Sequence, residues 1–206
     1  MLIRVVTIRA GIPQTGEGIA FVHGELQPMV AALDGNRGFT MAVDRSSGRY
    51  IGLTAWTDDE AVKANVDRAA GLVSDAARRL GGSEPLVEIL DLAVAHSVKP
   101  VRVGYWGRFT RVEITVDDLD RTVLKFRDTA LPLFEGYAGL ATINLFVNRM
   151  SGVAESVIWF DSLHVLRGSK PRWQEMQKLL AAVVPSLKIV EVAELEVVIA
   201  EMGPLS

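Results

Sequence analysis

Tryptophan and histidine side chains are the residues of this 206-residue chain best suited to chemistry. Trp56 and Trp159 each end a run of residues typical of a β-strand, where an indole can stack on an aromatic ligand. His23 follows Val22 on a predicted helix and could act as a general base, a frequent role of imidazole. Packing of both indoles in a core, and a solvated or hydrogen-bonded His23, are the alternatives.

Other common reaction centres are missing from the sequence. The chain has no cysteine, which excludes disulfides, thiolate metal sites, Fe–S clusters and cysteine nucleophiles. The three histidines lie far apart and no HxH, HxxE or HExxH motif occurs, so we expect no metal site. G-x-G-x-x-G, Walker A and G-x-S-x-G motifs are also absent, and we expect no cofactor.

Composition and charge narrow the class of protein. A hydrophobic content of 49% can form a sizeable core, while a net charge of -3 without a basic cluster beyond Lys170 and Arg172 disfavours nucleic acid as a partner. Arg4 interrupts the apolar residues of 1–8, and no apolar run reaches the length of a membrane span. We therefore expect a cytoplasmic protein that does not enter a membrane, and the lack of cysteine suits a reducing compartment.

Hydrophobic spacing in the first half predicts the order β-α-β-β-α-β. Period-two and β-branched patterns indicate strands, apolar residues at helical spacing indicate helices, and the turn RSSG joins a hairpin. Asp58 or Asp59 can cap the second helix. The predicted elements are a strand over 2–8, a helix over 16–33, a hairpin over 38–56, a helix up to Leu80 and a strand over 86–96.

The second half predicts the same order, and its hairpin echoes the first hairpin. DRSSGRYIGLTAWTD and NRMSGVAESVIWFD match when one residue is deleted, which aligns Trp56 with Trp159 and Asp58 with Asp161. Internal duplication is the economical explanation. We therefore predict a first repeat over 1–97, a connector over 98–107 and a second repeat over 108–206.

Duplication gives each repeat a partner for the sheet face that its helices leave uncovered. In the second repeat, one strand face is fully apolar and suits the helices, whereas the other face is mixed. The mixed face carries Arg111, Glu113 and Asn144, which we expect at an interface between the repeats. An isolated buried charge is costly, so Arg111 should pair with a glutamate.

The strand GRYIGLTAW, which ends in Trp56, and the acidic residues that open the next helix resemble antibiotic biosynthesis monooxygenase-like domains of the dimeric α/β-barrel superfamily. The resemblance covers almost the whole chain. It implies an α+β fold in which tandem ferredoxin-like units form an intramolecular dimeric α/β-barrel. Members of that family include cofactor-independent quinone-forming monooxygenases and haem-degrading enzymes.

The residues of the haem-degrading members are mostly absent. Those relatives use an Asn on the first strand, a Trp at the end of the third and a His on the following helix. The tryptophans match, but Thr7 and Thr115 stand at the Asn position and the helix after Trp56 has no histidine. His164 follows Trp159 too closely to replace it. Haem degradation is therefore not expected.

The resemblance predicts a cofactor-independent monooxygenase that acts on an apolar aromatic substrate. The alternative is a non-catalytic ligand-binding or structural pseudo-dimer, which fits the missing Asn and His. A small apolar or aromatic ligand and a second copy of the pseudo-dimer are the expected partners. The sequence identifies no catalytic residue.

Residue size before the two tryptophans predicts where a cavity lies. Gly52 and Thr54 precede Trp56, whereas Glu155 and Val157 precede Trp159, and small residues leave room beside an indole. Trp173 can fill the second repeat. We therefore expect the cavity in the first repeat, with ligand-binding residues Trp56, Tyr50, Thr54, His23 and Thr7.

Overall fold

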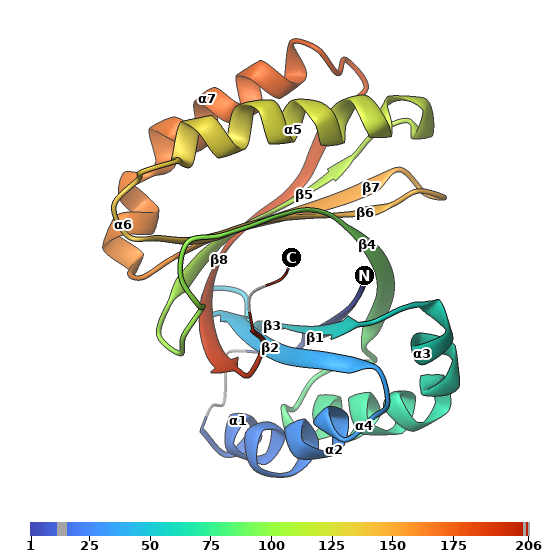
Figure 1. Ribbon diagram of the computed structural model, residues 1–206. Helices are drawn as coiled ribbons and strands as arrows, with labels where there is room; N and C mark the ends of the chain where they lie inside the picture. The colour runs from blue at the N-terminus through green and yellow to red at the C-terminus, as the bar shows by residue number, and fades with distance from the viewer. Residues whose placement is uncertain (12–15, 204, 206) are drawn as a thin grey trace. The chain divides into compact units, whose positions relative to one another are not determined.

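The computed structural model describes residues 1–11, 16–203 and 205, and it has an α+β fold (Figure 1). The order β-α-β-β-α-β occurs twice, which confirms the element order predicted from hydrophobic spacing. Two compact units are present. The first unit contains Met1–Leu90 and Leu195–Gly203, and the second unit contains Asp91–Glu194.

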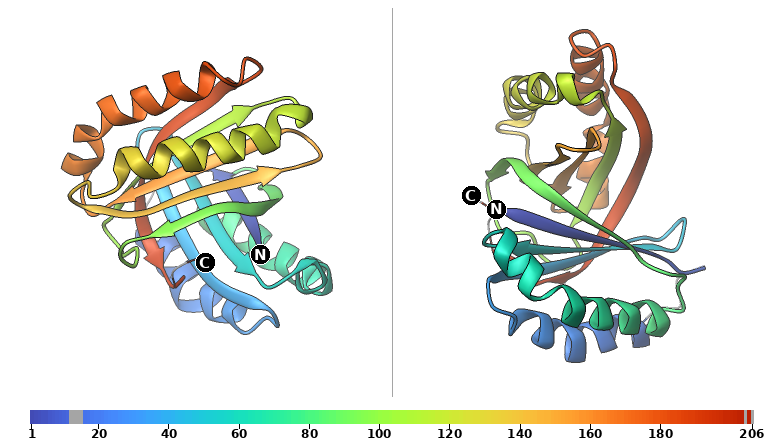
Figure 2. Two further views of the ribbon diagram at one scale, coloured as in Figure 1. Left: turned by 45° about the horizontal axis from the view of Figure 1, so that its top comes forward. Right: turned by 90° about the vertical axis from the view of Figure 1, so that its right-hand side faces the viewer.

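In the first unit, helices cover one face of an antiparallel sheet in which β3 pairs with both β1 and β2 (Figures 1 and 2). Side chains alternate between the two faces of each strand, so every second residue points toward the helices. The elements of this half of the sequence are β1 (Leu2–Arg9), α1 (Gly16–Phe21), the π-helix η1 (Val22–Leu26), α2 (Gln27–Ala31), β2 (Asn36–Asp44), β3 (Arg49–Trp56), α3 (Asp59–Ala64), α4 (Val66–Arg79) and β4 (Leu86–Ser97).

Two predicted helices of the first unit are interrupted. The π-helical turn η1 divides the first, and the amide of Gln27 at its end donates to the carbonyl of Val22. Pro28 follows in the first turn of α2, where its missing amide hydrogen is tolerated. Asn65 separates α3 from α4, and Asp58 caps α3 by accepting a hydrogen bond of 2.8 Å from the amide of Ala61.

The second unit has the same layers, with α5 and α7 over a sheet in which β7 pairs with β5 and β6 (Figure 1). Trp106 already belongs to a strand, although the sequence places it in the connector. The elements of this half of the sequence are β5 (Trp106–Glu113), the 3₁₀ turn η2 (Val116–Asp118), α5 (Leu119–Phe134), β6 (Leu140–Asn148), β7 (Val153–Phe160), α6 (Leu163–Gly168), α7 (Lys170–Ala181) and β8 (Lys188–Ala200).

The registers of β1, β2 and β3 correspond to those of β5, β6 and β7 at a constant spacing of 104 residues, whereas the last strands β4 and β8 correspond at a spacing of 105. Leu2 lies opposite Trp56, and Trp106 lies opposite Phe160. The hairpins have equal length, because Asp44 faces Arg49 just as Asn148 faces Val153. Their glycines, Gly48 and Gly152, have φ values of 71° and 72°, a conformation that glycine adopts readily.

The alignment of Trp56 with Trp159 is therefore wrong. The residue at the spacing of Trp56 is Phe160, and Trp159 points to the opposite face because neighbouring strand residues alternate. Likewise Ser162, not Asp161, corresponds to Asp58, since Ser162 caps α6 by accepting from the amide of Val165 at 3.3 Å. The alignment of the two tryptophans required a one-residue deletion, but the strand pairings of the two halves match without any deletion.

The last strand of each sequence half continues past its own unit. Residues Asp91–Ser97 of β4 pair with β6, while Glu196–Ala200 of β8 pair with β2. The predicted boundaries at 97 and 108 follow the repeated element order. The compact units are divided differently, because residues 91–97 belong to the second unit and Leu195–Gly203 belong to the first.

The polar residues predicted for an interface have partners of their own. Arg111 forms an ion pair with Glu155, which confirms the predicted pairing of Arg111 with a glutamate. Asn144 donates to the hydroxyl of Thr142 at 3.3 Å, and Glu113 lies 3.9 Å from Lys188. Their role at an interface stays a prediction.

Candidate ligand-binding cavity

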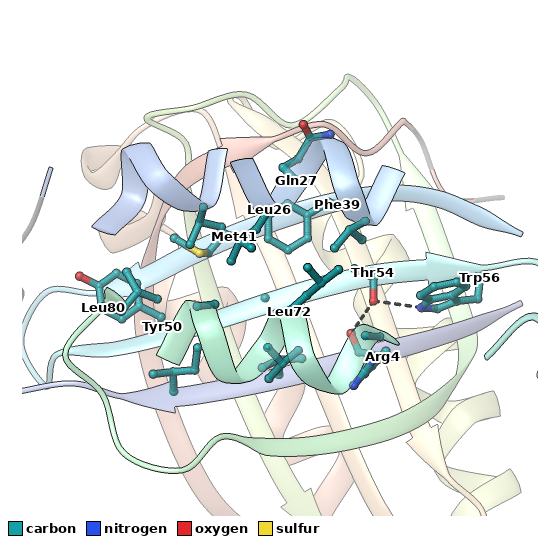
Figure 3. A pocket seen from close by; sticks show the side chains of 18 residues that line it. Arg4, Leu26, Gln27, Phe39, Met41, Tyr50, Thr54, Trp56, Leu72 and Leu80 are labelled. Atoms are coloured by element: carbon teal, nitrogen blue, oxygen red, sulfur yellow. Dashed lines mark hydrogen bonds between the residues drawn. The ribbon is translucent and has the colours of Figure 1, made fainter. Parts of the chain in front are cut away.

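A cavity lies within the first unit, between the sheet and the helices (Figure 3). Its volume is about 70 Å³. Its wall is mostly apolar, which suits the body of an apolar ligand. Strands supply Arg4, Val6, Ile8, Phe39, Met41, Tyr50, Gly52, Thr54 and Trp56, and helical segments supply Val22, Leu26, Gln27, Val30, Ala69, Leu72, Val73, Ala76 and Leu80.

Strand alternation explains which residues reach the cavity. On β3, Tyr50, Gly52, Thr54 and Trp56 are two residues apart and share the face turned toward the helices. Gly52 has no side chain, and a Cβ atom there would lie 3.4 Å from the Phe39 ring. The middle of β3 therefore leaves space that a larger residue would fill.

One end of the cavity is held by a short chain of hydrogen bonds. The indole Nε1 of Trp56 donates to the hydroxyl of Thr54 at 3.0 Å, and this hydroxyl lies 3.4 Å from the carbonyl oxygen of Arg4 (Figure 3). Trp56 is only 1% exposed. Its indole nitrogen is thus satisfied within the wall, which fixes the ring beside the cavity.

Among the described residues, two titratable side chains line the cavity. Burial raises the pKa of the Tyr50 hydroxyl above its ordinary value, and the charge of Arg45 opposes this shift. Burial also lowers the pKa of Arg4, although a guanidinium remains charged at neutral pH. Figure 3 shows Arg4 beside Thr54 and Trp56 at one end, and Tyr50 near Leu80 at the other.

The structure brings together three of the predicted ligand-binding residues and separates two. Trp56, Tyr50 and Thr54 lie in the cavity wall. Thr7 does not, because it alternates with the cavity-lining residues of β1 and so faces the other side of the sheet. The His23 side chain is 57% exposed and lies 3.6 Å from the carboxylate of Glu201, away from the wall. Whether the three lining residues bind a ligand stays a prediction.

Sequence analysis missed Arg4 as a site residue. It shares the cavity face of β1 with Val6 and Ile8, at a spacing of two residues. A single charged residue on an otherwise apolar strand face is unusual. That pattern was the signal by which the sequence could have identified it.

The corresponding cavity of the second unit is smaller, with a volume of about 20 Å³. Residues at the constant spacing explain the difference. Where the first unit has Ala69, the second has Trp173, and the indole of Trp173 donates to the hydroxyl of Thr110 at 3.1 Å. Phe126 similarly stands at the position of Val22. Larger side chains therefore occupy the space that stays open in the first unit.

Residues 1–11, 16–203 and 205 contain neither a cluster of metal-binding side chains nor a membrane-spanning helix. Within these ranges, no group of three or more histidine, aspartate or glutamate side chains could hold a metal ion. No helix in the same ranges combines the length and apolar character needed to cross a membrane.

Two proteins of Mycobacterium tuberculosis (strain H37Rv) are similar in sequence. The uncharacterized protein Rv2558 is 32% identical over 200 residues, which cover 97% of this chain and 84% of the relative. The uncharacterized protein Rv2557 is 32% identical over 167 residues, which cover 81% and 74%. This chain belongs to their family. No family model matches the sequence.

Solved structures identify the fold of this family member. A "putative monooxygenase" from Lactobacillus acidophilus NCFM has a TM-score of 0.73 at 12% identity, covering 99% of this chain and 97% of its own. An anthrone oxidase-like protein has a TM-score of 0.67 at 12% identity, covering 98% and 94%. A ferredoxin fold protein from Listeria monocytogenes, related to antibiotic biosynthesis monooxygenases, has a TM-score of 0.52 at 12% identity, covering 95% of each chain. The chain therefore shares the fold of these proteins, as the resemblance in its sequence predicted.

Proposed function

We propose that the first unit binds a small aromatic molecule and oxidises it with molecular oxygen without a cofactor. The observation that carries this proposal is the Trp56-lined apolar cavity, in a fold shared with monooxygenase-type proteins. An indole ring in an apolar wall favours a flat aromatic substrate. Exclusion of water strengthens electrostatic interactions with a charged intermediate.

The proposed reaction converts an activated methylene group into a carbonyl group. The substrate loses two hydrogen atoms, one oxygen atom of O₂ enters the product, and the other leaves as water. All four electrons taken up by O₂ come from the substrate, so no external reductant is needed. The protein must assist loss of the first proton and stabilise the anion that remains, and Arg4 supplies a positive charge in the wall.

Non-catalytic binding is the second candidate, and one observation favours it. Of the described residues that line the cavity, only Arg4 and Tyr50 are titratable, and neither is an ordinary general base. A substrate would therefore have to be acidic enough to lose its proton easily. A ligand carrier would need no such base.

Oxygen uptake separates the two candidates. Purified protein is mixed with anthrone in an oxygen electrode cell, and binding is measured in parallel under anaerobic conditions by quenching of tryptophan fluorescence. We expect saturable binding and consumption of one O₂ per anthrone, both lost in Trp56→Ala. Binding without faster oxygen uptake than in buffer would favour the carrier function, and absence of binding would count against both.

We also propose that the two halves arose by duplication and form one intramolecular barrel. The constant spacing of corresponding registers supports the duplication. The similarity to two solved structures extends over 94% or more of their length. This supports a single fold that includes both halves of the chain. Small-angle scattering of the purified chain, compared with such a structure, tests the barrel.

A further inference from the structure

Arg4 is a buried cation in the cavity wall. It is only 7% exposed, and no hydrogen bond or ion pair joins its guanidinium to residues 1–11, 16–203 or 205. A buried charge without a partner is costly, so buried arginines are normally paired. An arrangement of this kind is typical of a site that receives its counter-charge from a ligand.

Arg108, at the constant spacing from Arg4, shows which partners the same side chain has within the second unit, although its Nε atom is buried with no hydrogen bond to the described residues. Its guanidinium lies 5.3 Å from the ring of Trp173, donates to the carbonyl oxygen of Leu166 at 3.2 Å and approaches Glu194 at 3.7 Å. The second unit thus supplies both an aromatic face and a carboxylate to its arginine.

The first unit keeps the arginine but lacks both of these partners. Ala69 stands at the position of Trp173. Through the registers of the last strands, Ile89 stands at the position of Glu194. The loss of the indole leaves space over Arg4, and the loss of the carboxylate leaves its charge uncompensated. Both differences act on the same side chain and leave room for an anion.

Tyr50 provides an independent polar group at the other end of the cavity. Its hydroxyl is buried and has no hydrogen-bond partner among the described residues, and the tyrosine as a whole is 1% exposed. Apolar residues such as Met41 and Leu72 lie along the wall between the two ends (Figure 3). A buried hydroxyl normally finds a partner, so a ligand oxygen would complete it.

We propose that the cavity binds an elongated aromatic acid, with its carboxylate at Arg4 and a hydroxyl or carbonyl oxygen at Tyr50. This inference rests on the proposed binding of an aromatic molecule and adds the chemical class of that molecule. A carboxylate fits because the planar guanidinium can donate two parallel hydrogen bonds to its two oxygens. The aromatic body lies along the apolar wall beside Trp56.

Three probes of similar shape test the two ends separately: 6-hydroxy-2-naphthoate, its methyl ester and 2-naphthoate. Dissociation constants are measured by isothermal titration calorimetry at neutral pH. We expect 6-hydroxy-2-naphthoate to bind at least about tenfold more tightly than its ester, because charge-assisted hydrogen bonds are lost in the ester. It should also bind more tightly than 2-naphthoate, which lacks the oxygen for Tyr50.

Matched variants assign these preferences to residues. Arg4→Met should remove the preference for acid over ester, and Tyr50→Phe should remove the preference for the hydroxylated probe. Arg108→Met is the control and should keep both preferences. The melting temperature should stay the same or rise in Arg4→Met, which removes an uncompensated charge, and fall in Arg108→Met, which breaks existing contacts.

Each outcome decides the inference. Equal affinities of acid and ester for the unmodified protein would overturn it while leaving aromatic binding intact, and this comparison needs no variant. Failure of all three probes to bind would overturn both the inference and the proposed aromatic binding. Retention of the acid preference in a folded Arg4→Met variant would overturn the assignment to Arg4.

Discussion

Replacing Gly52 by alanine should stabilise the protein, because glycine within a strand is less stable than alanine where the backbone and the surrounding space allow a side chain. The φ angle of Gly52 is not in the positive region that favours glycine, so alanine is compatible with the backbone. The new methyl group would point into the cavity, at 3.4 Å from Phe39 Cε2 and 3.9 Å from Val6 Cβ. These distances are ordinary van der Waals contacts.

The expected gain has two parts. Burial of one additional carbon contributes about 0.8 kcal/mol. The unfolded chain has fewer accessible conformations with alanine than with glycine, which contributes about 0.4–1 kcal/mol more. Together they should raise the free energy of unfolding by about 1–2 kcal/mol, which corresponds to roughly 2–8 °C in melting temperature for a chain of this size. The same methyl group should weaken binding of an aromatic probe, because it occupies ligand space.

Urea unfolding followed by circular dichroism measures this change, and the midpoint should rise with an unchanged slope. Gly107→Ala is the matched control. A Cβ atom at Gly107 would overlap Cε3 and Cζ3 of Trp159, so this variant should lose about 1–3 kcal/mol through overpacking. A Gly52→Ala variant that is less stable than the unmodified protein would refute the cavity, since it would show that the position is already filled.

Three further outcomes follow from the same contacts. Trp56→Ala and Trp159→Ala should each lower the free energy of unfolding by about 3–5 kcal/mol, because both rings are buried, but only Trp56→Ala should also change ligand affinity in a calorimetric titration. Residues 1–97 expressed alone should aggregate or self-associate in size-exclusion chromatography, because β2 would lose its pairing with Glu196–Ala200; a cooperatively folding monomer would contradict this. The hydrogen bond from the amide of Ala61 holds the pKa of Asp58 below its ordinary value of 3.8. The ionised carboxylate therefore stabilises the folded protein above pH 3.8, and this stabilisation is lost as the pH falls through the lower pKa of the folded state. The stability difference between the unmodified protein and Asp58→Ala should accordingly shrink in acid, as measured by urea unfolding across a pH series.

Local sequence patterns were sufficient for the elements and their order. Strands and helices follow from periods of two and 3.6 residues, and a glycine such as Gly48 marks its hairpin turn. Helix caps such as Asp58 could be predicted for the same reason. The amide of Ala61, from which Asp58 accepts a hydrogen bond, lies only three residues away in the sequence. These features depend on near neighbours in the chain, which the sequence displays directly.

Identical residue types in the sequence were a poorer guide to structurally equivalent positions than the hydrogen-bond register of the strands. Trp56 and Trp159 look equivalent in sequence, yet the register assigns Phe160 to the position of Trp56. A shift of one residue moves a strand side chain to the opposite face. Only the pairing of strands distant in sequence reveals that shift.

The sequence by itself determined the α+β class, the repeated element order and the small residues near Trp56. The tertiary structure alone decided which side chains share a cavity and which charge within it has no partner among residues 1–11, 16–203 and 205. Arg4, Gly52 and Ala69 belong to three separate elements, and no local pattern relates them. Their juxtaposition depends on strand register and helix packing, because the space left over Arg4 results from what several distant side chains do not fill.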